Sequence, residues 1–205
     1  MECDQLPYRL GLFLLLVFAA TARPASAHRE RISRSSAPQG ISIPSLSHGQ
    51  MQVIAANLSA IRELAERQDP TDLTMRRLQD FVNLQQFACL WGMVPGSLTD
   101  EASPFNECAH SYLAGARALL MHLRQMPGGD RRAVDALVSK IELEMLSDNA
   151  SLVLCRYSDE PFNTDEVIAP HWSRIPAHLP SLATFAAILS FIAGAAILPL
   201  RRAAA

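Results

Sequence analysis

The chain has 205 residues, 49% of them hydrophobic, which is enough for one domain with a sizeable core. Its formal net charge of -2 and its sequence pI near 6.3 indicate no basic surface overall. Since nucleic-acid binding depends on such a surface, the composition argues against a nucleic acid as partner.

The N-terminus has the pattern of a signal peptide. Arg9 precedes an apolar run over residues 10–22, and residues 25–27 read Ala-Ser-Ala, the small-x-small pattern after which signal peptidase cleaves. The run is too short to cross a hydrocarbon layer of about 30 Å. We therefore expect residues 1–27 to be removed. Residues 28–47 mix Arg, Ser, Pro and Gly without a period and are expected to form a flexible arm.

The body, residues 48–156, shows the 3,4 spacing of apolar residues that is typical of amphipathic helices. Capping residues and Gly or Pro breaks divide it into four helical segments. They run approximately over residues 48–69, 72–91, 104–127 and 130–155, and an interruption of the last segment at Asp148-Asn149 is the alternative. Because each apolar stripe needs a partner, the simplest fold is all-α, an antiparallel four-helix bundle with up-down-up-down topology.

The C-terminus contains a long apolar segment. Residues 179–200 carry no charge and are long enough, as a helix, to cross a membrane. Arg201 and Arg202 follow, which favours a short cytoplasmic tail at 201–205. We therefore expect a single-pass membrane protein with its body outside the cytoplasm, in the bacterial periplasm, joined to the span by a tether at 157–178. A sorting tail that is removed after export is the alternative for this span.

Small residues recur at every fourth position of this apolar segment, at Ala186, Ser190 and Gly194. This spacing lets membrane helices approach closely, so the three residues are a candidate helix contact in a homo-oligomer. Chance explains the spacing equally well, because the segment is rich in Ala.

Three cysteines of the body are expected to converge. In the up-down-up-down topology the end of the second segment, the start of the third and the end of the fourth lie at one pole, which brings together Cys89, Cys108 and Cys155. Cys89 and Cys108 flank one loop at similar distances, as a cross-link between antiparallel neighbours requires. We predict a disulfide between them and a free thiol at Cys155, with a bond from Cys155 to either of the others as the alternative.

The same pole offers a different reading. Together with His48 and His110, the cysteines would place soft ligands close enough for a metal ion or for thiol redox chemistry. However, His110 lies about 120° round its helix from Ala116, at about 100° per residue, and is therefore expected to face solvent. A paired Cys-x-x-Cys is also missing from the sequence. We therefore predict no metal or other cofactor.

The loop between the second and third helical segments is more apolar than a connector needs. We regard its large apolar residues as a candidate patch for a protein partner. They are Leu90, Trp91, Met93, Val94, Leu98 and Phe105. The alternative is that Trp91 and Phe105 simply cover the end of the bundle.

No catalytic constellation is visible in the sequence. Serines occur in caps and loops without a Gly-x-Ser-x-Gly motif, and no residue visibly orients a Cys–His pair. We therefore expect a non-enzymatic, membrane-anchored accessory or interaction protein of the cell envelope, whose protein partner is unknown. The alternative is a metal-binding or thiol-redox protein that uses the pole formed by Cys89, Cys108 and Cys155.

Overall fold

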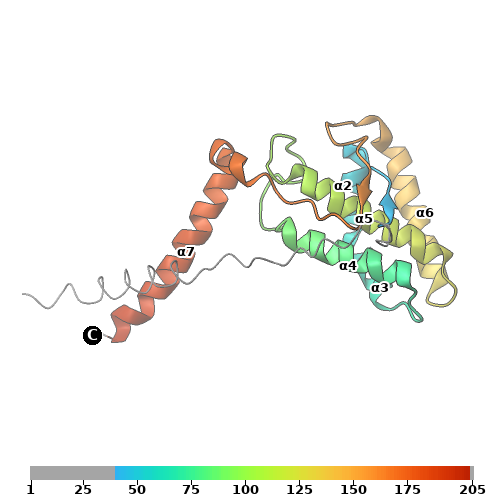
Figure 1. Cartoon of the computed structure of the whole chain (residues 1–205), viewed down its shortest axis with the longest axis horizontal. Coiled ribbons are helices and arrows are strands. Elements are labelled where there is room, and N and C mark those ends of the chain that lie inside the picture. Colours follow the sequence, from blue (N-terminus) through green and yellow to red (C-terminus); the bar gives the residue numbers. More distant parts are fainter. Residues whose placement is uncertain (1–39, 204–205) are drawn as a thin grey trace, which may run out of the picture. The chain divides into compact units, whose positions relative to one another are not determined.

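The structure is a computed structural model, and it describes residues 40–203 (Figure 1). The signal peptide predicted at residues 1–27 lies outside the described residues, as does most of the arm predicted at 28–47. The side chains of the C-terminal helix are described as far as Ala195.

Helices make up most of the described chain, so the all-α prediction is confirmed. The α-helices are α2 (His48–Ala56), α3 (Leu58–Glu66), α4 (Leu73–Ala88), α5 (Asn106–Gln125), α6 (Arg131–Ser147) and α7 (Leu179–Ala203). Two 3-10 helices, η1 (Ala150–Leu152) and η2 (Trp172–Ala177), and two short strands, β1 (Ser42–Ile43) and β2 (Phe162–Asn163), complete the described elements.

Side-chain caps define the start of several helices. The Asp72 carboxylate accepts a hydrogen bond from the Met75 amide at the start of α4, with a donor to acceptor distance of 2.6 Å. Asp130 accepts in the same way from the Ala133 amide at the start of α6, at 3.1 Å. Because the first amides of a helix have no partner within the helix, these carboxylates fix where α4 and α6 begin.

Helix α5 is the centre of the fold, and it contacts α2, α3, α4 and α6 (Figure 1). Its most extensive packing is on α4. A Cβ atom at Gly115 of α5 would lie 2.9 Å from ring atoms of Phe81 on α4, so only glycine permits this close approach. Tyr112 and Leu113 of α5 are fully buried, which shows that the helix is covered on more than one face.

The first predicted helix is in fact two helices, which meet at Asn57. The buried Asn57 amide donates to the Val53 carbonyl at 2.9 Å and to the Glu144 carboxylate at 2.7 Å, and its oxygen accepts from Lys140 at 2.8 Å. The 3,4 spacing continues through this break. The interruption therefore results from polar contacts with α6, which local periodicity does not reveal.

Segments outside the predicted body also belong to the fold. Strand β1 pairs antiparallel with β2, with Ser42 opposite Asn163 and Ile43 opposite Phe162. Ile43 and Leu46 are completely buried in the main core. Residues 40–47 are thus part of the core rather than of a flexible arm, because their apolar side chains pack against residues far along the chain.

The prediction of a membrane span at residues 179–200 is wrong. Within residues 40–203, the structure contains no helix with the length and apolar character needed to cross a bilayer. The prediction counted uncharged residues from Leu179 onward, whereas the first turn of α7 is attached to the folded part, with Ser181 completely buried and the Phe185 ring 6.2 Å from that of Phe105. The single-pass membrane localisation was inferred from this span and is therefore also wrong. It included a body outside the cytoplasm and a cytoplasmic tail.

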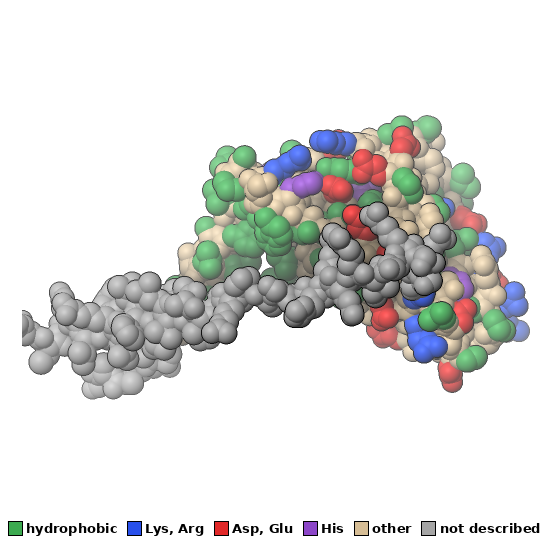
Figure 2. Space-filling view, in the orientation of Figure 1, with side chains coloured by type: hydrophobic (Ala, Val, Ile, Leu, Met, Phe, Trp, Pro, Cys, Tyr) green, Lys and Arg blue, Asp and Glu red, His purple; other side chains and the backbone are tan. Residues whose placement is uncertain are grey.

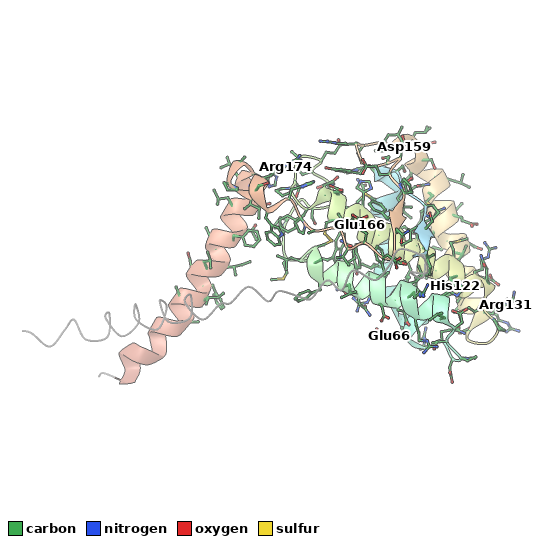
Figure 3. The ribbon with its side chains drawn as sticks, in the orientation of Figure 1. Glu66, His122, Arg131, Asp159, Glu166 and Arg174 are labelled. Atoms are coloured by element: carbon green, nitrogen blue, oxygen red, sulfur yellow. A yellow bond between two sulfur atoms is a disulfide. The ribbon has the colours of Figure 1, made fainter. Side chains whose placement is uncertain are left out.

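Charged side chains of both signs alternate over the face of the helical part seen in Figure 2. Glu66, Arg131 and Asp159 lie on its outside (Figure 3). Exposed ion pairs, such as that of Arg67 with Glu63 at 3.0 Å, contribute little to stability, so the fold depends mainly on its apolar core.

Candidate functional site

Two histidines and a cysteine come together beside α5. His48 is the first residue of α2, His110 lies near the start of α5, and Cys155 follows η1. One ligand-capable atom from each of the three residues lies within 4.8 Å of the others. We call this group the His2Cys site.

The start of α2 holds the segment that carries the cysteine. The Ser47 hydroxyl caps α2 by accepting from the Gln50 amide at 3.2 Å, and it donates to the Ala150 carbonyl at 2.6 Å. The Gly49 amide donates to the Val153 carbonyl at 3.1 Å. A Cβ atom at Gly49 would lie 2.5 Å from the Ala150 oxygen, so glycine is needed for this contact. Residues 150–153 are therefore fixed against α2, which brings Cys155 close to His48.

The sulfur of Cys155 has two polar neighbours. Its Sγ atom lies 2.9 Å from Nε2 of His110, and the Ser158 hydroxyl donates to it at 3.4 Å. Ser158 in turn accepts from the Cys155 amide at 2.8 Å, which orients the hydroxyl towards the sulfur. The sulfur is thus held between an imidazole nitrogen and a hydroxyl group.

Burial differs among the three ligands. His110 is 0% exposed and His48 is 6% exposed, whereas Cys155 is partly exposed. Tyr157, which is also buried, lies with its ring 5.9 Å from that of His110. Cys155 is therefore the member of the site nearest to solvent, and the two imidazoles form its enclosed side.

Burial, with a smaller contribution from the neighbouring His48, lowers the pKa of His110 from 6.5 to about 4. At neutral pH this imidazole is uncharged, so one of its nitrogens carries a free lone pair. In the part of the chain that the structure describes, Nδ1 of His48 and Nδ1 of His110 are buried without a hydrogen-bond partner. Such an atom costs about 1–3 kcal/mol unless an additional ligand or water satisfies it.

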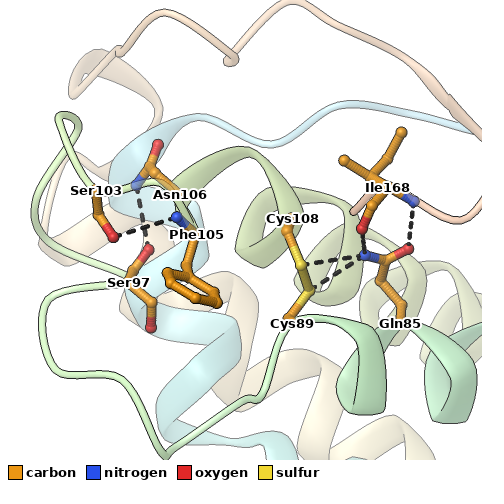
Figure 4. The surroundings of a disulfide bond; sticks show 8 residues. All are labelled: Gln85, Cys89, Ser97, Ser103, Phe105, Asn106, Cys108 and Ile168. Atoms are coloured by element: carbon orange, nitrogen blue, oxygen red, sulfur yellow. Dashed lines mark hydrogen bonds between the residues drawn. A yellow bond between two sulfur atoms is a disulfide. The ribbon is translucent and has the colours of Figure 1, made fainter. Parts of the chain in front are cut away.

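The predicted disulfide is confirmed. Cys89 and Cys108 are bonded, with their Cα atoms 5.6 Å apart, and Cys155 is a free thiol. Figure 4 shows that the side-chain amide of Gln85 reaches both sulfur atoms, at 3.1 and 3.4 Å, and pairs with the backbone of Ile168. Because both bonded cysteines are buried and oxidised, they are not available as ligands, and the predicted pole of three cysteines is not one site.

The expectation that His110 faces solvent is wrong. The helical-wheel argument assumed that α5 buries one face, towards its neighbours in a bundle. In the structure α2 and the segment that follows η1 cover a further face, and His110 points into this second interface. Sequence reasoning also missed Ser158 and Tyr157, because their contacts with the site depend on the path of the chain after η1.

The predicted partner patch is divided between the core and the surface. Val94 and Phe105 are buried, and Met93 is exposed. The others are partly buried: Leu90, Trp91 and Leu98. Phe105 packs into the end of the helical part, as the alternative interpretation expected, whereas Trp91 is only partly buried. The small residues Ala186 and Ser190 of α7 are exposed, and Gly194 is partly exposed.

A separate hydrogen-bonded group of Ser181, His178 and Asp100 has the residue types of a hydrolase triad. Nδ1 of His178 lies 2.7 Å from the Ser181 hydroxyl, and Nε2 lies 2.8 Å from the Asp100 carboxylate. The Ser181 amide also donates to Nδ1, so His178 acts as a cap for the first turn of α7. Ser181 is completely buried and out of reach of a substrate. This hydrogen-bonded group therefore attaches the start of α7 to the loop that contains Asp100, and it is not the site of a nucleophile.

No family model matches this chain, and searches of curated proteins and of solved structures found no similar protein either. Its function must therefore be inferred from its own residues. Within residues 40–203, the His2Cys site is the group whose ligand atoms are close enough to hold a metal ion.

Proposed function

We propose that this protein binds one transition-metal ion through imidazole nitrogens of His48 and His110 and the thiolate of Cys155. The observation that carries the proposal is the approach of these three ligand atoms to within 4.8 Å of one another. Imidazole and thiolate are the ligands that zinc and copper prefer in proteins.

The surroundings of the ligands support this proposal. Both imidazoles have a buried nitrogen without a partner among the described residues, and the low pKa of His110 keeps that ring neutral and ready to bind at pH 7. The hydrogen bonds of Ser47 and Gly49 hold the ligands in place before an ion arrives. A prearranged site loses less conformational entropy on binding.

The wider role that we propose is that of a non-enzymatic accessory protein whose protein partner remains unknown. We further propose that the helices form an antiparallel four-helix bundle with up-down-up-down topology and that residues 1–27 are removed as a signal peptide. A membrane anchor is not proposed.

Thiol chemistry is the second candidate. The distance of 2.9 Å between Cys155 Sγ and His110 Nε2 is that of a thiol paired with a base, an arrangement that activates cysteine nucleophiles. In that case Cys155 itself would react, and no ion would be retained.

Metal stoichiometry tests the proposal. The purified full chain is dialysed against Zn(II), Co(II) or Cu(I), the last under argon, and the retained metal is measured by mass spectrometry. We expect one equivalent in the wild type for at least one of these ions, and loss of that ion in Cys155→Ser and His110→Gln. His171→Gln is the matched control, because His171 pairs with Glu107 at 2.7 Å and is not a member of the site. Equal retention by Cys155→Ser would refute the proposal. No retained ion together with rapid alkylation of Cys155 would support thiol chemistry instead.

A further inference from the structure

The charge of the ligand set restricts the ion that the His2Cys site can take. With a metal ion bound, the group would supply one thiolate and two neutral imidazoles, and in the described part of the chain it includes no carboxylate. Asp159 and Glu160, the acids nearest to Cys155 in sequence, are exposed. A bound ion would therefore be compensated by a single negative charge.

The site is a poor environment for uncompensated charge. His110 is completely buried, and His48, Tyr157 and Ser158 are at most 6% exposed. A monovalent ion with one thiolate gives a neutral complex, whereas a divalent ion leaves one positive charge in this interior. Because a buried charge without a counter-ion is costly, the electrostatics favour the monovalent ion.

The number of ligands also bears on the choice of ion. A zinc ion held by three protein ligands takes a water molecule or substrate as its fourth ligand. Cu(I), by contrast, is stable with three ligands. Residues 40–203 supply three members to this group and no fourth His, Cys, Asp or Glu. Thiolate is a soft ligand that selects Cu(I) and Zn(II) over harder ions, so the choice between these two ions depends on charge.

We propose that the metal is a soft monovalent ion, Cu(I), held by three ligands as a neutral complex; this inference rests on the metal-binding function proposed above. Binding replaces the thiol proton: the S–H bond breaks, the S–Cu bond forms, and the proton leaves to solvent. The ion does not change its oxidation state, so no oxidant or reductant is required.

Competition under argon tests the choice of ion. The reduced Cys155 form of the full chain, with its disulfide intact, is mixed with Cu(I) and the chelator bathocuproine disulfonate, and separately with Zn(II) and a zinc chelator of known affinity. We expect one Cu(I) per chain, X-ray absorption typical of three-coordinate copper with one sulfur, and binding of Ag(I), a redox-inert substitute, at the same stoichiometry. Cys155→Ser should bind Cu(I) at least about 100-fold more weakly, and His171→Gln should bind it like the wild type.

A pair of near-isosteric variants tests the charge argument directly. Ser158 lies 3.4 Å from the sulfur, so Ser158→Asp adds a negative charge beside the ion, and Ser158→Asn adds a similar side chain without charge. We expect the ratio of Zn(II) affinity to Cu(I) affinity to be about tenfold higher in Ser158→Asp than in Ser158→Asn. Circular dichroism and thermal unfolding establish that both variants are folded before they are compared.

The outcomes separate the two proposals. Retention of one Zn(II) in a four-coordinate site, with Cu(I) lost to its chelator, would overturn the monovalent assignment and leave metal binding intact. Retention of no ion would overturn both. An unchanged affinity ratio between Ser158→Asp and Ser158→Asn would contradict the charge argument even if Cu(I) binds.

Discussion

Helix α5 contributes to two sulfur centres, through Cys108 and His110, and the two centres differ in burial, oxidation state and hydrogen bonding. The disulfide of Cys108 is buried, and Gln85 donates to both of its sulfur atoms. Two residues further along, His110 meets a free thiol at 2.9 Å and keeps a buried nitrogen without a partner among the described residues. The structural cross-link thus has its polar neighbour satisfied, whereas the His2Cys site keeps buried nitrogens without a partner among the described residues.

The largest effect is expected from removal of the disulfide. Cys89→Ala combined with Cys108→Ala should lower the free energy of unfolding by about 2–5 kcal/mol, because the unfolded chain gains conformational freedom. If the two centres are independent, the double variant still binds one metal ion per chain at temperatures below its own melting temperature. Cys155→Ala is the control: it should remove the metal and cost less than about 1 kcal/mol of stability, as measured in urea.

Acidification should destabilise the metal-free protein through His110. Burial lowers the pKa of its imidazole from 6.5 in the unfolded chain to about 4 in the folded chain. Protonation therefore favours the unfolded state, and stability present above pH 6.5 is lost progressively as the pH falls towards 4, on the order of 3 kcal/mol.

His110→Gln serves as the comparison for this pH dependence, because glutamine does not titrate. Unfolding free energies of both proteins should be measured from pH 7.5 to 4. The two curves should diverge below pH 6.5, and parallel curves would contradict the buried neutral state of His110. The titratable groups closest to it, His48, Cys155 and Tyr157, are the same in both proteins.

The third effect concerns Gln85, which donates to the disulfide of Cys89 and Cys108. Gln85→Ala removes the bonds to the Ile168 amide and carbonyl, of 3.0 and 2.6 Å, together with the donor to the disulfide. Since Ile168 is partly exposed and water can replace some of these bonds, we expect a loss of about 1–3 kcal/mol. The Ile168 amide should also exchange with solvent faster. Gln52→Ala, an exposed glutamine on α2, should change neither quantity.

The smallest effect is expected at the contact between Gly49 and Ala150, which supports the His2Cys site. Gly49→Ala places a methyl group against the Ala150 backbone, so residues 150–153 must move away from α2. We expect metal affinity to fall by roughly tenfold, about 1.4 kcal/mol, while the disulfide remains formed. Unchanged affinity would show that the position of Cys155 does not depend on this contact.

The sequence was sufficient for one of these centres and not for the other. Cys89 and Cys108 flank a single loop, so local topology alone predicts their bond. The His2Cys site joins three segments that are distant in sequence. The helical-wheel prediction, which assumed one buried face of α5, placed His110 in solvent. A usable signal was present: α5 has no charged residue between Glu107 and Arg117, which is typical of a helix covered on several faces.

Other misses have similar causes. Asn57 interrupts a continuous apolar pattern through bonds to α6, and two-residue strands are too short to produce a periodic signal. Uncharged length alone also suggested a span at 179–200, where the first turn of α7 is attached to the folded part through Ser181 and His178. In each case a tertiary contact decides the outcome, and local sequence carries no record of it.

The pairing of β1 with β2 has a consequence for how the protein is made. The Ile41 amide bonds to the Thr164 hydroxyl across 123 positions of the chain, and Ile43 of the core lies opposite Phe162. During synthesis the first strand is therefore complete long before its partner leaves the ribosome. Closing a loop of this length is slow compared with forming local helices, so we expect the helices to form first and the strand pair to complete the core last. A chain that ends at residue 156 would leave Ile43 without its partner strand.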